Sequence, residues 1–63
     1  MENAKFKIGN AVNKTSGYKY PGIVVSVFSN TKGEIRYVVE CTLEGVQGML
    51  HIFNENQLEH YVE

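Results

Sequence analysis

The chain has 63 residues, of which 43% are hydrophobic and 21% are charged, and its formal net charge is −1. This hydrophobic fraction is typical of a folded domain and excludes an intrinsically disordered chain. Because the net charge is close to zero, no overall basic field attracts nucleic acid, and we expect no nucleic-acid partner.

Small size limits how such a domain is stabilised. A domain of about 60 residues buries only about 60% of its unfolded surface, and it usually needs disulfides, a metal or a partner subunit. The single cysteine, Cys41, excludes an internal disulfide. One Cys and two separated His cannot form a closed four-ligand zinc site within one chain. We therefore assign no metal and expect a homo-oligomer, either a dimer or a tetramer, with unaided folding at modest stability as the alternative.

The N-terminal residues lack the apolar segment of a signal peptide, and no apolar run approaches the roughly 18 residues that span a bilayer. Together with the unpaired cysteine, this predicts a cytoplasmic protein with no membrane association. We expect residues 1–5 to be a flexible N-terminus and residues 6–63 to form a single domain.

In chain order, residues 6–9 and 11–12 are expected to form the opening strand, and residues 13–19 a loop. Residues 22–28 are β-branched and aromatic and follow a Pro–Gly turn, which predicts a strand. Residues 29–33 predict a hairpin loop with Gly33 at positive φ, and residues 35–40 return as the paired strand. Of the tyrosines, we expect Tyr20 and Tyr37 to pack in the core or in an interface and Tyr18 to be exposed.

Residues 49–53 form the next predicted strand. By alternation, Leu50 and Ile52 face one side, and Met49, His51 and Phe53 face the other. Both sets are largely apolar, so both faces of this strand should be covered. A barrel has only one interior, and the second cover is expected to be a neighbouring subunit or a ligand.

Asn54 and Gln57 have the spacing of a capping box, which predicts a short helical turn, and residues 58–62 make a last strand. The order is one strand, a long loop, three strands, a helical turn and a strand. The predicted fold is therefore all-β, a five-stranded SH3-like barrel with a short helical turn before the last strand.

Residues 6–17, FKIGNAVNKTSG, follow the pattern F-x-x-G-D-x-V-x-K-x-S-G except for Asn10. This stretch resembles the opening of the type II, plasmid-borne, trimethoprim-insensitive dihydrofolate reductases. Residues 20–25 resemble that family's aromatic-x-G and following strand, and residues 37–40 resemble its Y-A-V-E. Its V-Q-I-Y corresponds to LHIF at 50–53, and its L-E to residues 58–59. The resemblance spans residues 6–59, with a length difference around residues 41–48.

The resemblance implies an SH3-like barrel that forms a homotetramer around a central pore, where NADPH and dihydrofolate bind together and react largely through proximity. Lys14 matches the lysine that attracts anionic ligands at the pore mouth, and Ile52 matches a residue whose backbone contacts them. His51 replaces the family's Gln, and Phe53 replaces its Tyr and lacks the hydroxyl. The ligand-binding residues implied in this way are Lys14, Leu50, His51, Ile52 and Phe53.

The residues themselves leave these roles open. His51 is a partly buried histidine, a ligand or symmetry-axis contact, or a metal ligand shared between subunits. Lys14 is a surface lysine or an anion-attracting residue. Cys41 is a packing residue, since no motif in the sequence indicates a base that would activate it or Ser16. No phosphate-binding loop and no Asp is present, and we assign no catalytic residue.

Three functions remain as hypotheses. The first is an oligomeric SH3-like barrel that binds an unidentified small molecule or protein and is related to the type II reductases. The second is an NADPH-dependent dihydrofolate reductase acting through a homotetrameric pore, with NADPH as the one cofactor that the resemblance implies. The third is a protein–protein interaction module or small inhibitor of phage or mobile-element origin.

All six Lys and Arg lie at or before Arg36, whereas five of the seven Glu lie at or after Glu40. Opposite charges on two halves favour complementary packing between subunits, if they remain on separate faces after folding. Ordinary solvated strands are the alternative explanation.

Overall fold

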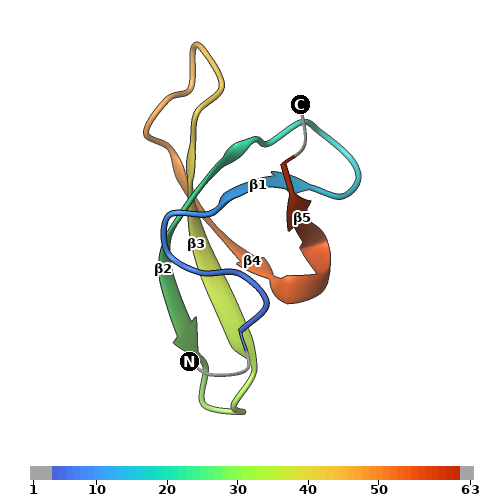
Figure 1. Cartoon of the computed structure of the whole chain (residues 1–63), viewed down its shortest axis with the longest axis vertical. Coiled ribbons are helices and arrows are strands. Elements are labelled where there is room, and N and C mark those ends of the chain that lie inside the picture. Colours follow the sequence, from blue (N-terminus) through green and yellow to red (C-terminus); the bar gives the residue numbers. More distant parts are fainter. Residues whose placement is uncertain (1–3, 62–63) are drawn as a thin grey trace.

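A computed structural model describes residues 4–61. These residues form five antiparallel strands in one sheet, with the order β4-β3-β2-β1-β5, and a single 3-10 turn before the last strand (Figure 1). No other helix is present among them, and none could cross a membrane. The elements are β1 (Ala11–Lys14), β2 (Gly22–Ser29), β3 (Ile35–Cys41), β4 (Leu50–Asn54), η1 (Glu55–Gln57) and β5 (Leu58–His60). The predicted all-β fold, its five strands and the turn before the last strand are confirmed.

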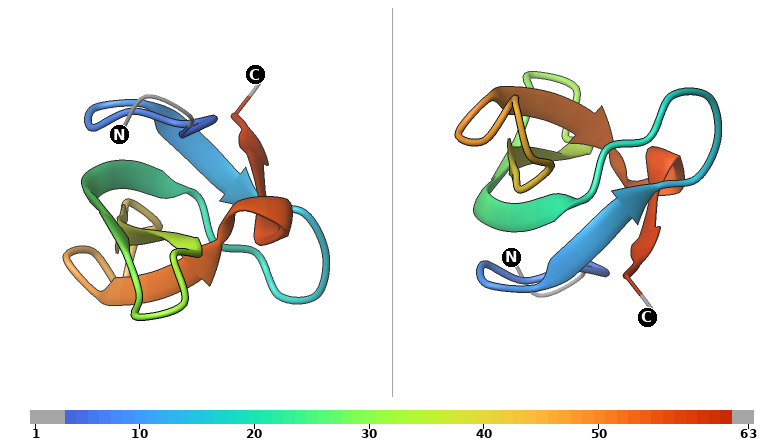
Figure 2. Two further views of the ribbon diagram at one scale, coloured as in Figure 1. Left: turned by 90° about the horizontal axis from the view of Figure 1, so that it is seen from below. Right: turned by 90° about the horizontal axis from the view of Figure 1, so that it is seen from above.

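The long hairpin of β2 and β3 forms the centre of the sheet. Its tight loop contains Gly33 at φ 80°, which confirms the predicted positive φ. The register between the two strands shifts between Val24 and Ser26, so Val25 lies in a β-bulge. A bulge bends its strand and increases the local twist. The sheet accordingly curls, and β1 and β5 lie across from β3 and β4 when the molecule is seen from either end (Figure 2).

The curled sheet encloses one core. Tyr20 and Tyr37 lie fully inside it, as predicted, and their hydroxyl groups have partners. Tyr20 donates to the carbonyl oxygens of Val39, at 3.3 Å, and Met49, at 2.9 Å. Tyr37 donates to Glu55 Oε2 at 2.6 Å. Buried hydroxyls are tolerated only when they are hydrogen-bonded in this way. The buried hydrophobic residues that form this core are Phe6, Val12, Tyr20, Val24, Tyr37, Val39, Cys41, Phe53 and Leu58.

The N-terminal segment differs from its prediction. Residues 6–9 form a turn and not part of the first strand, which begins at Ala11. The cause is Asn10, whose Oδ1 accepts from the Lys7 N–H at 2.9 Å while its own N–H donates to the Lys7 carbonyl at 3.0 Å. Asn side chains commonly stabilise turns by such local bonds. Phe6 is still fully buried, because the turn folds back over the core.

Other ends of the predicted strands also differ from their predicted positions. The first strand continues to Lys14, so the loop is shorter than expected, and the last strand ends at His60. Residue 62, which was expected in that strand, lies outside the described residues. Within the segment expected to be flexible, residues 1–3 also lie outside them, while the Lys5 N–H donates to Glu55 Oε2 at 3.1 Å.

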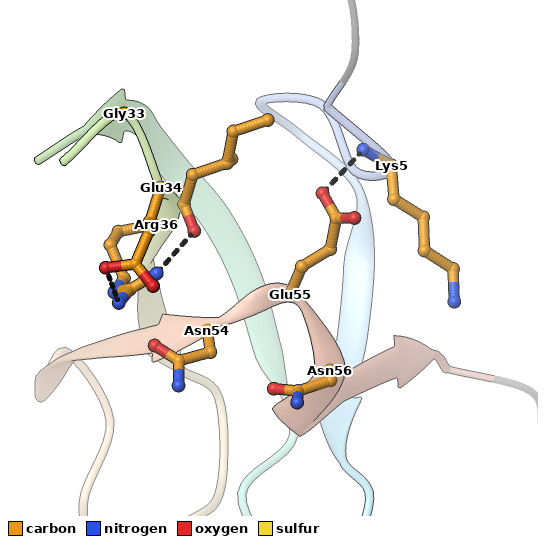
Figure 3. A pocket seen from close by; sticks show the side chains of 8 residues that line it. Lys5, Gly33, Glu34, Arg36, Asn54, Glu55 and Asn56 are labelled. Carbon is orange, nitrogen blue, oxygen red and sulfur yellow. Dashed lines mark hydrogen bonds and ion pairs between the residues drawn. The ribbon is translucent and has the colours of Figure 1, made fainter.

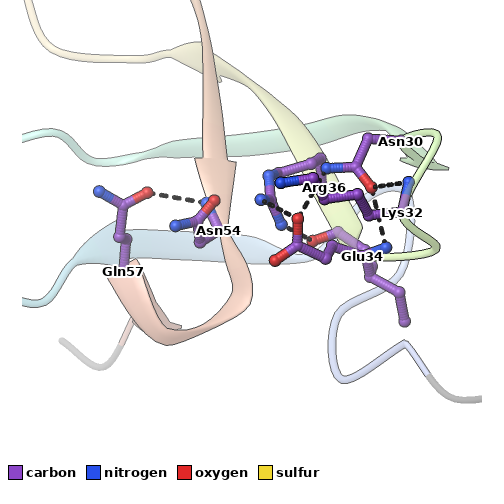
Figure 4. A network of polar contacts seen from close by, with 7 residues as sticks. Asn30, Lys32, Glu34, Arg36, Asn54 and Gln57 are labelled. Carbon is purple, nitrogen blue, oxygen red and sulfur yellow. Dashed lines mark hydrogen bonds and ion pairs between the residues drawn. The ribbon is translucent and has the colours of Figure 1, made fainter.

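Polar side chains fix the β2–β3 loop and the turn of η1 (Figure 4). The Asn54 N–H donates to Gln57 Oε1 at 2.8 Å, which is the contact that the capping-box spacing predicted. In the β2–β3 loop, Asn30 Oδ1 accepts from the backbone N–H groups of Lys32 and Glu34, each at 3.0 Å. These bonds satisfy backbone donors that have no partner in the sheet.

Candidate functional site

Alternation along β4 divides the ligand-binding residues that the resemblance implied. His51 and Phe53 point to the inner side of the sheet, and Phe53 is part of the core, with only 3% of its surface exposed. Leu50 and Ile52 point outward and are 55% and 63% exposed. The predicted division of residues 50–53 between two sides of the strand is confirmed, and the cover expected on the outer side stays a prediction. Lys14, the remaining member of the set, lies at the end of β1.

The imidazole of His51 is held by the aromatic core. Its ring is stacked on that of Tyr20, with a centroid distance of 5.0 Å and an interplanar angle of 3°. The Phe53 ring lies edge-on to both, at 5.1 Å from Tyr20 and 5.7 Å from His51. Such pairs add stabilisation beyond the area they bury. His51 is therefore half-buried, with one ring face covered by Tyr20 and its orientation set by these contacts.

Tyr18 brings Lys14 and His51 together. Its hydroxyl group lies 3.5 Å from His51 Nδ1, and the Lys14 Nζ lies 4.6 Å from the centre of its ring. An ammonium group over an aromatic face is attracted by the ring's negative charge density. Tyr18 itself is 58% exposed. We call Lys14, Tyr18 and His51 the Tyr18 surface.

The conformation of the loop after β1 explains the spacing of Lys14, Ser16 and Gly17 in the sequence. Lys14 Nζ donates to the carbonyl oxygen of Ser16 at 2.6 Å. A Cβ at position 17 would lie 2.9 Å from the same nitrogen, and Gly17 has a φ of 80°. The loop thus folds around the lysine, and the positive φ at position 17 favours glycine there. The ammonium group is consequently held beside Tyr18 and not extended into solvent.

A separate groove of about 550 Å³ lies between the β2–β3 loop and η1 (Figure 3). Its two carboxyl groups already have partners. Glu55 accepts from the Tyr37 hydroxyl and the Lys5 N–H, and these bonds lower the pKa of its carboxyl group. Burial, followed by the bond to Glu55, raises the pKa of Tyr37. The lining residues are Lys5, Gly33, Glu34, Ile35, Arg36, Asn54, Glu55 and Asn56.

The opposite wall of this groove is held in the same way. Asn30 Nδ2 donates to Glu34 Oε1 at 2.9 Å, and the Arg36 guanidinium lies 3.2 Å from the same oxygen. The bond from Asn30, together with the charge of Arg36, lowers the pKa of Glu34. Shifted pKa values in this groove therefore come from contacts that hold the fold, and they do not indicate a catalytic group.

A smaller hollow of about 310 Å³ lies on another part of the surface. Pro21, Ile23 and Leu43 make it partly apolar, and Lys19 and Glu44 add one charge of each sign. None of the residues that the resemblance implied lines it. Its full lining is Ala11, Lys19, Pro21, Gly22, Ile23, Thr42, Leu43, Glu44 and Tyr61.

Other candidate chemistry is limited in residues 4–61. They contain no group of three or more His, Cys, Asp or Glu side chains that could hold a metal ion. Cys41 is buried in the core, as expected of a packing residue. His60 lies against the Phe6 ring, with a centroid distance of 4.8 Å.

No family model matches this chain, and no curated protein matches it significantly. The resemblance to the type II dihydrofolate reductases therefore stays a prediction from the motifs. The sequence analysis named Lys14 and His51 but did not include Tyr18, which links them. The one signal for Tyr18 was its expected exposure as an aromatic residue in a loop.

Proposed function

We propose that this chain is a small SH3-like barrel that binds a flat, negatively charged small molecule at the Tyr18 surface. The observation that carries the proposal is the position of Tyr18 between Lys14 and His51. An exposed aromatic ring offers a face for stacking, and the neighbouring lysine offers a positive charge. The half-buried imidazole adds a polar ring edge that donates or accepts a hydrogen bond, depending on its tautomer.

Binding is favoured over catalysis by what surrounds these residues. A nucleophile needs a base within hydrogen-bonding reach. The hydroxyl beside His51 Nδ1 is the phenol of Tyr18, at 3.5 Å, which is the outer limit of a hydrogen bond, and Lys14 contacts a carbonyl oxygen and the Tyr18 ring. The carboxyl groups with shifted pKa values, Glu34 and Glu55, belong to the groove at the β2–β3 loop. The Tyr18 surface is accordingly equipped to hold a ligand.

Titration with NADPH tests the proposal, because this molecule combines flat rings with phosphate groups. We expect the wild-type chain to change NADPH fluorescence in a saturable way. Tyr18→Ala and Lys14→Gln should each weaken binding about tenfold, which corresponds to about 1.4 kcal/mol. Lys32→Gln, in the β2–β3 loop, is the matched control and should bind as the wild type does. Absence of binding, or equal binding by Tyr18→Ala, would contradict the proposal.

The reductase hypothesis is the second candidate, and one observation favours it. Lys14 and His51, which the resemblance matches to two positions of the reductase pore, both contact Tyr18. If dihydrofolate is added to the NADPH complex, a reductase transfers hydride to it, and NADPH absorbance falls as NADP⁺ forms. Binding of NADPH without this loss of absorbance would leave the binding function and exclude the reductase.

A further inference from the structure

The face of β2, β3 and β4 that points away from the core carries both apolar and charged side chains. Tyr37 and Val39 point inward from β3, so Arg36, Val38 and Glu40 point outward. The strand register places the other outward residues in three rows with them. We call this set the outer face: the rows are Phe28, Arg36 and Asn54, then Ser26, Val38 and Ile52, then Ile23, Glu40 and Leu50.

Two apolar residues of this face are well exposed. Ile52 and Leu50 are more than half exposed and neighbour each other on the outward side of β4. Val25, in the bulge of β2, adds a third exposed apolar residue. β4 also lies at an edge of the sheet, with β3 as its one paired strand. Contiguous apolar surface of this kind marks interaction sites, since its burial is favourable by about 25 cal/mol per Å².

The charges on β3 indicate what the outer face binds. Along the outward side of β3, Arg36 lies near one end and Glu40 near the other, with Val38 midway between them. Suppose that two copies pack face to face around a two-fold axis. The axis lies between the two sheets, passes over Val38 and runs perpendicular to β3. Each Arg36 then faces Glu40 of the other copy, twice in one interface. This is the self-complementarity that a two-fold dimer requires.

Under the same operation the apolar residues of the outer face match except Leu50, which meets Asn54 of the other copy. Ile52 and Val38 share the central row, so each meets its own equivalent. Phe28 is in the row of Arg36 and Ile23 in the row of Glu40, so Phe28 of one copy meets Ile23 of the other. A two-fold axis parallel to the strands would instead place Arg36 on Arg36 and Glu40 on Glu40, and like charges destabilise such a packing.

We propose that the outer face is the interface of a two-fold homodimer in which the β3 strands of the two copies run antiparallel. The dimer covers the second apolar side of β4, which the sequence analysis expected to be covered. Tyr18 and His51 lie outside this interface, because His51 points to the opposite side of β4. Failure of the dimer and failure of ligand binding are therefore separate results.

Equilibrium sedimentation at increasing protein concentration is the first test. The wild-type mass should rise from the 7.1 kDa of the single chain toward about twice that value. Ile52→Lys should stay at the single-chain mass, with an unchanged circular dichroism spectrum. Ile8→Lys is the matched control, because Ile8 is 69% exposed and lies off the outer face. A wild-type chain that stays monomeric, or an Ile52→Lys chain that dimerises normally, would overturn the proposal.

Charge reversal tests the antiparallel arrangement. Arg36→Glu and Glu40→Arg should each weaken self-association at least tenfold, since each places like charges at both ends of the interface. An equimolar mixture of the two variants should regain the dimer, because the mixed pair has opposite charges at both ends. The mixture also controls for the lost contact between Arg36 and Glu34, which is 3.2 Å long. A mixture as monomeric as its components would overturn the arrangement.

Discussion

The inner and outer faces of β2, β3 and β4 are built from alternate residues of the same strands, but only the inner face is covered within one chain. Val24, Tyr37, Val39 and Phe53 are almost completely buried. Ile52, next to Phe53, is 63% exposed. Hydrophobicity alone therefore does not decide whether a strand residue is buried in the single chain. The inner residues determine the fold, and the outer residues are free to determine what the folded chain binds.

The largest effect expected from this comparison is at the inner face. Phe53→Ala removes a ring that packs on Tyr20 and His51, and it should lower the free energy of unfolding by about 3–5 kcal/mol. Ile52→Ala, one residue away, should change it by less than about 0.5 kcal/mol in dilute, monomeric samples. Guanidinium unfolding at low protein concentration measures both. Similar losses for the two variants would contradict the distinction between the faces.

The next effect concerns a hydrogen bond from the inner face. Tyr37→Phe keeps the ring and removes the hydroxyl that donates to Glu55. Because it leaves a carboxylate and the Phe6 N–H without this partner, it should cost about 1–3 kcal/mol. Tyr18→Phe is the control in a loop, and we expect a cost below about 0.5 kcal/mol there. Thermal unfolding compares the two, and equal costs would show that the bond to Glu55 contributes little.

A smaller effect follows from the shifted pKa values of this pair. The pKa of Glu55 is lowered in the folded chain, so its contribution to stability is present above about pH 4.3, the unfolded value, and is lost as the pH falls through the folded value. The pKa of Tyr37 is raised, so its contribution is lost as the pH rises above about 10. Denaturant unfolding between about pH 3 and pH 7 covers the titration range of carboxyl groups. It therefore measures the loss of the Glu55 contribution. Tyr37→Phe should show a weaker acid dependence than the wild type, and an equal dependence would contradict this explanation.

The smallest effect is expected at the rim of the outer face. Leu50→Gln should leave the stability of the monomer within about 0.5 kcal/mol of the wild type, because more than half of this side chain is exposed. The substitution should still weaken self-association, since Leu50 lies on the outer face, in the same row as Glu40. Sedimentation and unfolding of the same samples separate the two quantities. A large loss of monomer stability would show that Leu50 supports the core.

Much of the fold could be predicted because it is encoded locally. The β-branched runs gave β2 and β3, the alternation of residues 50–53 gave the two faces of β4, and the Asn54–Gln57 spacing gave the 3-10 turn. The turn at residues 6–9 was missed because the side chain of Asn10 closes it. An apolar pattern does not reveal such a bond.

The candidate site was predictable only in part, because it depends on contacts between distant segments. Lys14 and His51 could be named from motifs, but their common neighbour Tyr18 follows from a loop that folds around Lys14. The outer face depends on strand register as well. The bulge at Val25 places Ser26 in the row of Val38, and simple alternation along β2 from Val24 would have placed Ser26 on the inner side.

Isotope-filtered nuclear Overhauser spectroscopy on a mixture of labelled and unlabelled chains shows directly whether a second copy covers the outer face. We expect contacts between chains from the methyl groups of Val38 and Ile52 to the same groups of the other copy. We also expect contacts between Phe28 and Ile23. The absence of contacts between chains at a concentration where the dimer should form, or contacts confined to residues such as Ile8, would contradict the proposed dimer.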